Sequence, residues 1–170
     1  MIVLGIDSGS TSVGWCRLRA SGGGMGRAIR LAYLAGGKCD ATPAAILALV
    51  DGAQGEAGAP RAELVAIERV EGGLFRRRGR RAAPASQLFA TSHVAGGIAW
   101  MLDVAGVGVV VQPATWWRRI VLGRGSASDR SIRVVVPRLV DDWPERSSVH
   151  VRDAAGVAIA AVWTRRGRAA

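Results

Sequence analysis

The sequence has few cysteines, few aromatic residues and almost no lysine. Cys16 and Cys39 are its two cysteines, too few for a disulfide framework or a four-ligand zinc site. We therefore expect a reducing compartment, the cytoplasm. No apolar run approaches the roughly 18 to 20 residues of a membrane span. Asp7 also interrupts the opening MIVLGID before a signal-peptide core can form, so we expect no membrane segment.

Arginine, in contrast, is abundant. The 170 residues contain 23 Lys and Arg against 13 Asp and Glu, which gives a net charge of +10, and Lys38 is the single lysine. This excess predicts a polyanionic partner, with nucleic acid first and an acidic membrane surface second. Arginine makes planar, bidentate contacts with phosphate, although a GC-rich coding genome would produce the same bias.

The length and composition predict one folded domain, residues 1–165, followed by a basic tail at 166–170. Apolar runs and turn residues predict strands at residues 1–7, 11–19, 28–35, 62–68 and 107–112. Helical spacing and capping residues predict helices at residues 44–50, 84–104, 113–122, 128–140 and 149–165. This order is typical of an α/β domain with one central sheet.

Two arginine clusters are candidate DNA-binding segments. The basic loop at 71–82 has no periodicity and places Phe75 among Arg76, Arg77, Arg78, Arg80 and Arg81. An aromatic wedge between arginines suits a loop that inserts into DNA and contacts phosphates, and the alternative is a solvated loop with no specific role. The second cluster surrounds GRGSASD, whose glycines and helix start offer backbone N–H groups to phosphate. It contains Arg118, Arg119, Arg124 and Arg130.

Four residues that can bind metal stand at the ends of predicted elements. Asp7 and Glu68 each end an apolar strand, and His150 and Asp153 are three residues apart in the first turn of the last helix, on one face. Each alone could cap a turn, pair with an arginine or stabilise a helix start. Together they predict a cation, because several buried carboxylates are costly without one and hard oxygen ligands suit Mg²⁺ or Mn²⁺. Paired divalent ions catalyse phosphodiester hydrolysis, so the four residues predict a nuclease.

These segments also carry a family resemblance. GIDSGSTSVGW, VAIERV, a long helix of small residues, VVVQPATWWRRIVLGRG and HVRDAAGVAIAA follow one another along nearly the whole chain. In this order they resemble the RuvC-type Holliday junction resolvases. The resemblance implies a ribonuclease H-like fold with a central mixed five-stranded sheet flanked by helices. It also implies that Asp7, Glu68, His150 and Asp153 bind two Mg²⁺ ions, for which we expect Mn²⁺ to substitute.

The resemblance further implies a homodimer that resolves four-way DNA junctions by paired symmetric nicks, with a branch-migration motor as a candidate further partner. One departure is Glu71, which stands where many relatives carry an aromatic wedge. Two alternatives stay open from the residues alone. One is a nuclease of the same fold that acts on other branched DNA or RNA/DNA hybrids, and the other is a scaffold that binds junctions without cutting them.

Overall fold

The computed structural model describes residues 1–22, 28–53, 60–69 and 85–166. The basic loop at 71–82, with Phe75 and its arginines, and residues 167–170 of the predicted tail lie outside these ranges. Within them, no helix is long and apolar enough to cross a membrane.

Five strands form one mixed sheet in the order β3-β2-β1-β4-β5. The strands are β1 (Ile2–Ser8), β2 (Ser12–Ser21), β3 (Arg30–Asp40), β4 (Leu64–Arg69) and β5 (Gly108–Pro113). The first three form an antiparallel meander, whereas β4 pairs parallel to β1 and β5 parallel to β4. The carboxyl ends of β1, β4 and β5 therefore lie at the same edge of the sheet. The predicted α/β class and the mixed five-stranded sheet are confirmed.

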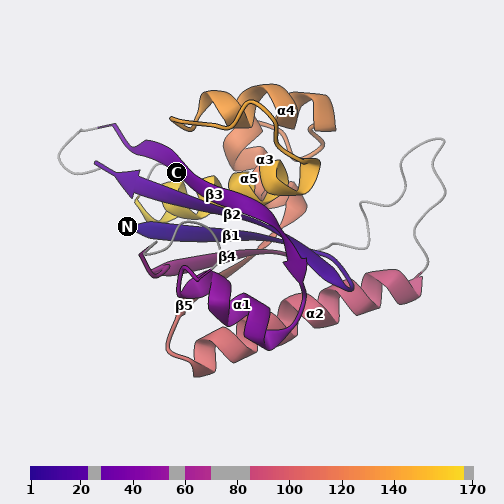
Figure 1. The fold of residues 1–170 in the computed structure, drawn as a ribbon. Coiled ribbons are helices and arrows are strands. Elements are labelled where there is room, and N and C mark those ends of the chain that lie inside the picture. Colours follow the sequence, from indigo (N-terminus) through magenta and orange to yellow (C-terminus); the bar gives the residue numbers. More distant parts are fainter. Residues whose placement is uncertain (23–27, 54–59, 70–84, 167–170) are drawn as a thin grey trace.

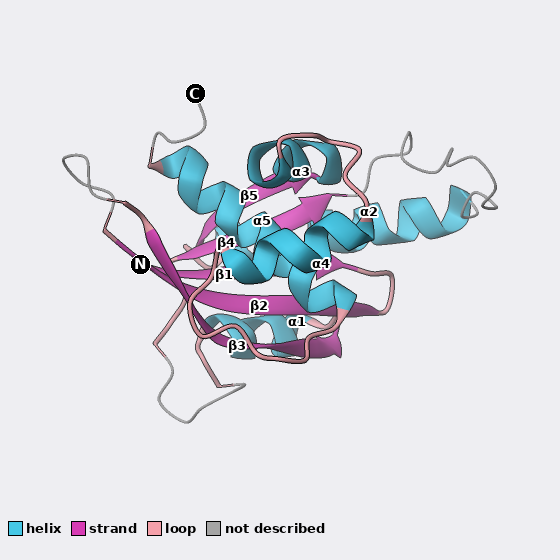
Figure 2. Cartoon of the chain, turned by 90° about the horizontal axis from the view of Figure 1, so that it is seen from above, coloured by secondary structure: helices cyan, strands magenta, loops and turns pink. Residues whose placement is uncertain are grey.

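Helices cover both faces of the sheet (Figures 1 and 2). They are α1 (Pro43–Val50), α2 (Ala85–Val104), α3 (Ala114–Leu122), α4 (Asp129–Arg138) and α5 (Val149–Arg165). One apolar cluster joins the sheet to α3, α4 and α5, and a second joins its other face to α1 and α2. Because strand side chains alternate between faces, Val3 belongs to the first cluster and Ile2 and Leu4 to the second.

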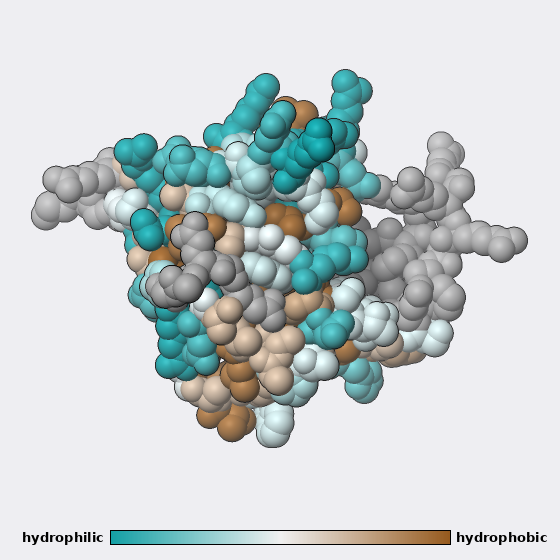
Figure 3. Space-filling model, in the orientation of Figure 1, coloured by the Kyte–Doolittle hydropathy of each residue, from teal (hydrophilic) through white to brown (hydrophobic). Residues whose placement is uncertain are grey.

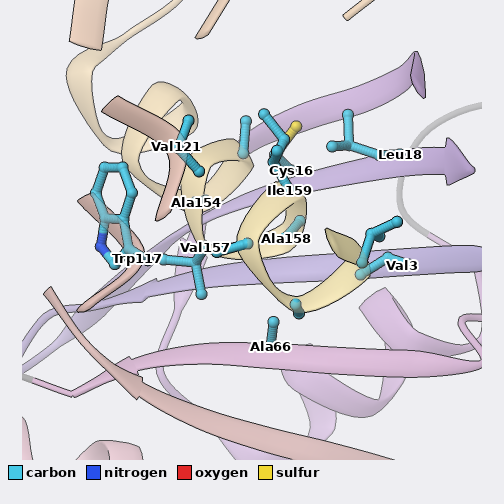
Figure 4. Packing of buried hydrophobic residues seen from close by; sticks show 14 of the residues in the cluster. Val3, Cys16, Leu18, Ala66, Trp117, Val121, Ala154, Val157, Ala158 and Ile159 are labelled. Carbon is cyan, nitrogen blue, oxygen red and sulfur yellow. The ribbon is translucent and has the colours of Figure 1, made fainter. Parts of the chain in front are cut away.

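Helix α5 lies unusually close to the sheet, since small residues face each other across the interface (Figure 4). A Cβ atom at Gly5 of β1 would lie 1.9 Å from the backbone oxygen of Ala154 and 3.1 Å from the Cβ of Ala158. A Cβ atom at Gly14 of β2 would lie 2.5 Å from the Cβ of His150. Glycine in a strand interior marks such a close backbone approach, and here it seats the first turns of α5 directly on β1 and β2.

The observed elements differ from the predicted ones in two informative places. Strand β3 continues to Asp40 instead of ending at residue 35, because β2 pairs with it along its whole length. Paired glycines such as Gly96 and Gly97 in a helix favour close packing, but here both are exposed and have open space where a Cβ would lie. Thr42, Ser128 and Ser148 cap α1, α4 and α5, each by accepting a hydrogen bond from a backbone N–H of the first helical turn.

Candidate active site

Two acidic residues are brought together by the parallel pairing of β1 and β4. Ile6 is paired with Ile67, and both side chains belong to the cluster under α1 and α2. The next residue on each strand is Asp7 and Glu68, and alternation turns both side chains towards the opposite face, where α5 lies. The Asp7 side chain is 15% exposed and Glu68 is 7% exposed. The strand ends thus place two carboxyl groups in a nearly water-free environment.

Helix α5 adds two further groups at the same edge. Ser148 caps the helix by accepting a hydrogen bond from the Val151 N–H, which fixes the orientation of the first turn. His150 Nδ1 lies 2.7 Å from Asp7 Oδ2, within hydrogen-bond distance. One turn further on, the Asp153 side chain is 13% exposed. All four candidate metal ligands predicted from the sequence therefore gather around one end of the sheet.

Helix α3 contributes two residues whose roles the sequence did not show. The Trp117 Nε1–H donates a hydrogen bond of 2.7 Å to Glu68 Oε2. An Arg118 guanidinium nitrogen lies 3.9 Å from Asp153 Oδ2, and that arginine side chain is only 12% exposed. Arg118 was grouped with the arginines expected on the DNA-binding surface, whereas the structure places its guanidinium within the acidic site.

Burial and mutual repulsion shift the carboxyl groups in one direction. Desolvation, followed by the charges of Asp7 and Asp153, raises the pKa of Glu68 to about 8. Desolvation and the charge of Asp7 raise the pKa of Asp153 to about 7, against the opposing effect of Arg118. The pKa of Asp7 is also raised by desolvation, although the bond with His150 opposes this. The positive charge of Arg118 opposes these rises in pKa without cancelling them, so the three carboxyl groups together favour the binding of a further cation.

The donor set fits a divalent cation without forming a ready-made cage. Among the described residues, no three His, Cys, Asp or Glu side chains converge as metal ligands do. In place of such a cluster, His150 contacts Asp7, while Arg118 lies beside Asp153. Asp153 Oδ1 is nevertheless buried without a hydrogen-bond partner in the described chain, and a buried carboxylate oxygen in this state is a free ligand. Carboxylate oxygens and one imidazole suit Mg²⁺ and Mn²⁺.

The raised pKa values predict that the metal-free protein loses stability as the pH rises. The folded chain holds protons on Glu68 and Asp153 that the unfolded chain releases near pH 4, so stability falls between about pH 4 and pH 8. In EDTA we expect the melting temperature to be about 5 °C lower at pH 8.5 than at pH 6, and Mn²⁺ to restore it at pH 8.5. In Glu68→Gln the side chain at position 68 cannot ionise, so the difference in melting temperature between pH 6 and pH 8.5 should be smaller. An equal melting temperature of the wild-type protein at both pH values would contradict the raised pKa values.

The other described arginines of the second cluster are on the surface. Arg119, Arg124 and Arg130 are exposed, and Arg124 donates a weak hydrogen bond of 3.4 Å to the Ser131 hydroxyl. Arg119 and Arg124 line a surface hollow with Trp116 and Gly125. Their side chains are placed to contact a ligand, while the role expected for them stays a prediction.

Gln112 is a further polar residue that the sequence analysis did not single out. It is paired with Glu68 in the register of β4 and β5, it is 2% exposed, and neither its amide oxygen nor its nitrogen has a partner in the described chain. The sequence does contain a signal for Gln112, because it is a polar residue at the end of an apolar strand, as Glu68 is. The pattern VVVQ carries that signal as clearly as VAIE does.

Several solved structures resemble this chain in fold. Thermus thermophilus RuvC matches with a TM-score of 0.67 and 22% identity over 99% of this chain and 98% of its own. T. thermophilus RuvC in complex with a Holliday junction substrate also gives 0.67, at 19% identity and the same coverage. The yeast mitochondrial Holliday junction resolvase gives 0.53 at 12% identity over 96% of this chain and 79% of its own.

No family model matches the sequence, and no curated protein matches it either. The two Thermus matches cover nearly the whole length of both chains. The chain therefore has the same fold as T. thermophilus RuvC.

Proposed function

We propose that this protein is a Mg²⁺-dependent endonuclease that resolves four-way DNA junctions by paired symmetric nicks. The observation that carries the proposal is the gathering of Asp7, Glu68, His150 and Asp153 at the carboxyl edge of the parallel strands. It is supported by the fold shared with T. thermophilus RuvC, which has been solved with a Holliday junction substrate.

The four side chains would hold two Mg²⁺ ions, which supply an activated water and stabilise the leaving oxygen. Water would attack phosphorus and one P–O ester bond would break, with the proton of the water passing to a basic group at the site and the leaving oxygen taking up a proton from solvent. Asp7 orients the His150 ring through Nδ1, so that Nε2 is the nitrogen available to a cation or to that proton. Arg118 places a positive charge next to Asp153, where the negative charge of a scissile phosphate would also be neutralised.

The proposed partner is branched DNA held by the basic surface. Figure 3 shows hydrophilic residues covering the top of the molecule over α4, and Arg119, Arg124 and Arg130 are exposed on α3, α4 and the loop between them. Phosphate contacts by such side chains position a nuclease on DNA without reading its sequence. The arginines of the loop at 71–82, which lies outside the described residues, belong to the same proposal, with Leu74 or Phe75 as the side chain that enters the junction.

Paired nicks require two active sites, and we propose that α2 joins two copies of this chain. The helix is apolar on opposite sides, since Val94, Ile98 and Leu102 pack under the sheet while Phe89 and Trp100 are 67% and 71% exposed. With Gly96 and Val104, these two exposed residues lie along one side of the helix, where the exposed His93 stands between Phe89 and Gly96; we call this side the α2 stripe. Hydrophobic residues also gather at the bottom of Figure 3, over α1 and α2. Exposed apolar area of this kind is typical of an interface.

Trp100→Glu is therefore expected to convert the protein to a monomer. A charge in the middle of an apolar interface is left desolvated, so dimer affinity should fall at least about 100-fold. Sedimentation velocity over a concentration series measures this directly. Val134→Glu is the matched control, because Val134 is 45% exposed on α4, away from the stripe. A Trp100→Glu protein that remains dimeric would place the interface elsewhere.

The proposed activity is tested by cleavage of a labelled synthetic four-way junction beside duplex, flap and RNA/DNA hybrid, with Mg²⁺ and with EDTA. We expect paired nicks confined to the junction and dependent on Mg²⁺. Tight junction binding without cleavage would identify a scaffold. Cleavage of hybrid or flap alone would retain the nuclease chemistry and overturn the substrate.

A further inference from the structure

Trp117 is fully buried and makes one directional contact with the acidic site. Its Nε1–H donates a hydrogen bond of 2.7 Å to Glu68 Oε2, and the Glu68 side chain is itself buried, with 7% exposure. A hydrogen bond to a carboxylate is shorter and stronger than one between neutral groups, and it is stronger still away from water. The bond therefore restricts the rotation of the Glu68 carboxyl group, which a strand alone leaves free to turn.

The position of the indole is in turn fixed by α5. Gly156 lies against the ring, and a Cβ atom there would come within 2.3 Å of Cζ3 and 2.7 Å of Cε3. Figure 4 shows the Trp117 ring beside α5, near Val157 and Ala154. The Arg118 guanidinium also lies over the ring, 5.3 Å from its centroid. Only a residue without a side chain at position 156 allows the ring to lie where its N–H meets Glu68.

We propose that Trp117 is a positioning residue that fixes the Glu68 carboxylate for a divalent cation, and that Gly156 provides the space for its indole. The inference rests on the proposed function, in which Glu68 is a metal ligand. With Oε2 held by the indole, Oε1 is the oxygen presented to the cation. Residues that orient a metal ligand by hydrogen-bonding to it typically contribute 10- to 100-fold to metal affinity.

The test measures Mn²⁺ binding to the DNA-free protein by isothermal titration and by electron paramagnetic resonance. Trp117→Phe keeps an aromatic ring beside Gly156 and removes the N–H, and replacement of the indole by its benzothiophene isostere removes the N–H without changing the ring size. We expect Mn²⁺ affinity to fall about tenfold or more in both variants. Trp116→Phe is the matched control, because Trp116 is the adjacent residue of the same helix and its half-buried indole packs against the apolar cluster of α3, α4 and α5. The Mn²⁺ affinity of this variant should stay within about twofold.

Gly156→Ala tests the second half of the proposal with the indole N–H intact. The added methyl group displaces the ring, so Mn²⁺ affinity should fall although Trp117 itself is unchanged. Unchanged affinity in the isostere and in Trp117→Phe, with the wild-type protein binding Mn²⁺, would overturn the positioning role and leave the proposed function standing. A wild-type protein that binds no Mn²⁺ at pH 8.5 would instead overturn the proposed function, and this inference with it.

Discussion

Asp7→Asn is expected to lower junction cleavage at least about 1,000-fold, equivalent to about 4 kcal/mol of transition-state stabilisation. Asparagine has nearly the same shape and can still accept a hydrogen bond from His150, but it carries no negative charge. The substitution removes an anionic oxygen from the centre of the acidic site, where Asp7 acts on Glu68 and Asp153 electrostatically and contacts His150 directly. Single-turnover cleavage of a labelled junction in Mg²⁺ measures the loss.

The same substitution should leave folding and DNA binding intact. Desolvation disfavours the Asp7 carboxylate, so its removal relieves a cost in the metal-free protein, and the melting temperature in EDTA at pH 8.5 should not fall. Junction affinity in EDTA should stay within about threefold, because phosphate contacts by the surface arginines supply it. Loss of binding or of the folded state would show that Asp7 has a structural role.

Asp51→Asn provides the matched control for the chemistry of this exchange. Asp51 ends α1 and pairs with Arg61 at 3.3 Å, and both side chains are more than half exposed. An exposed ion pair contributes little to stability, so cleavage and melting temperature should both remain close to those of the wild-type protein. A comparable loss of cleavage in Asp51→Asn would mean that the effect of Asp7→Asn does not arise from its position.

The ends of β1 and β4 could be predicted from the sequence, because in each case an apolar run stops at an acidic residue. An apolar run that stops at a carboxylate is visible in MIVLGID and in AELVAIE, and parallel pairing then brings Asp7 and Glu68 to one edge. The spacing of His150 and Asp153 predicted their common helix face in the same way. These inferences depend on local periodicity, which tertiary packing did not override.

The contacts around those residues depend on tertiary structure and could not be predicted. Adjacent tryptophans at 116 and 117 predict that the two rings face different ways, but only the packing of α3 against α5 shows that Trp117 reaches Glu68. Arg118 and Arg119 are adjacent arginines of one helix, and the neighbouring sequence does not distinguish the one that lies beside Asp153 from the one in solvent. Helix spacing assigns a face, while the identity of the opposite surface comes from the fold.

The glycines of β1 and β2 are the clearest case, and they carry the second large prediction. In the sequence, Gly5 and Gly14 are parts of the motif GIDSGSTSVGW, whereas the structure shows that each makes room for the backbone or Cβ of α5. The small residues on α5 were visible in its sequence, but close approach requires small residues on both partners. On the strands these small residues are Gly5 and Gly14, and they determine how close α5 can lie to the sheet.

Alanine substitutions at three strand glycines are therefore expected to destabilise the protein in the order of their clashes. At Gly5 the new Cβ would lie 1.9 Å from a backbone oxygen that cannot move without shifting α5, so unfolding free energy should fall by about 3 kcal/mol or more. At Gly37 of β3 the nearest atoms lie at 3.4 and 3.5 Å, an ordinary contact with the Trp15 ring, and the change should be within about 1 kcal/mol. Gly37→Ala is thus the matched control for a strand glycine.

Gly14→Ala separates the position of the helix from the stability of the fold. Its Cβ would lie 2.5 Å from that of His150, so the first turn of α5 must move away from β2 and carry His150 away from Asp7. Stability should fall less than for Gly5→Ala, because the clash is smaller, while cleavage by the folded protein should fall at least about tenfold through displacement of the ring. Urea unfolding and single-turnover cleavage below the melting temperature measure the two effects. Full cleavage by a folded Gly14→Ala protein would show that the contact between α5 and β2 does not set the geometry of the acidic site.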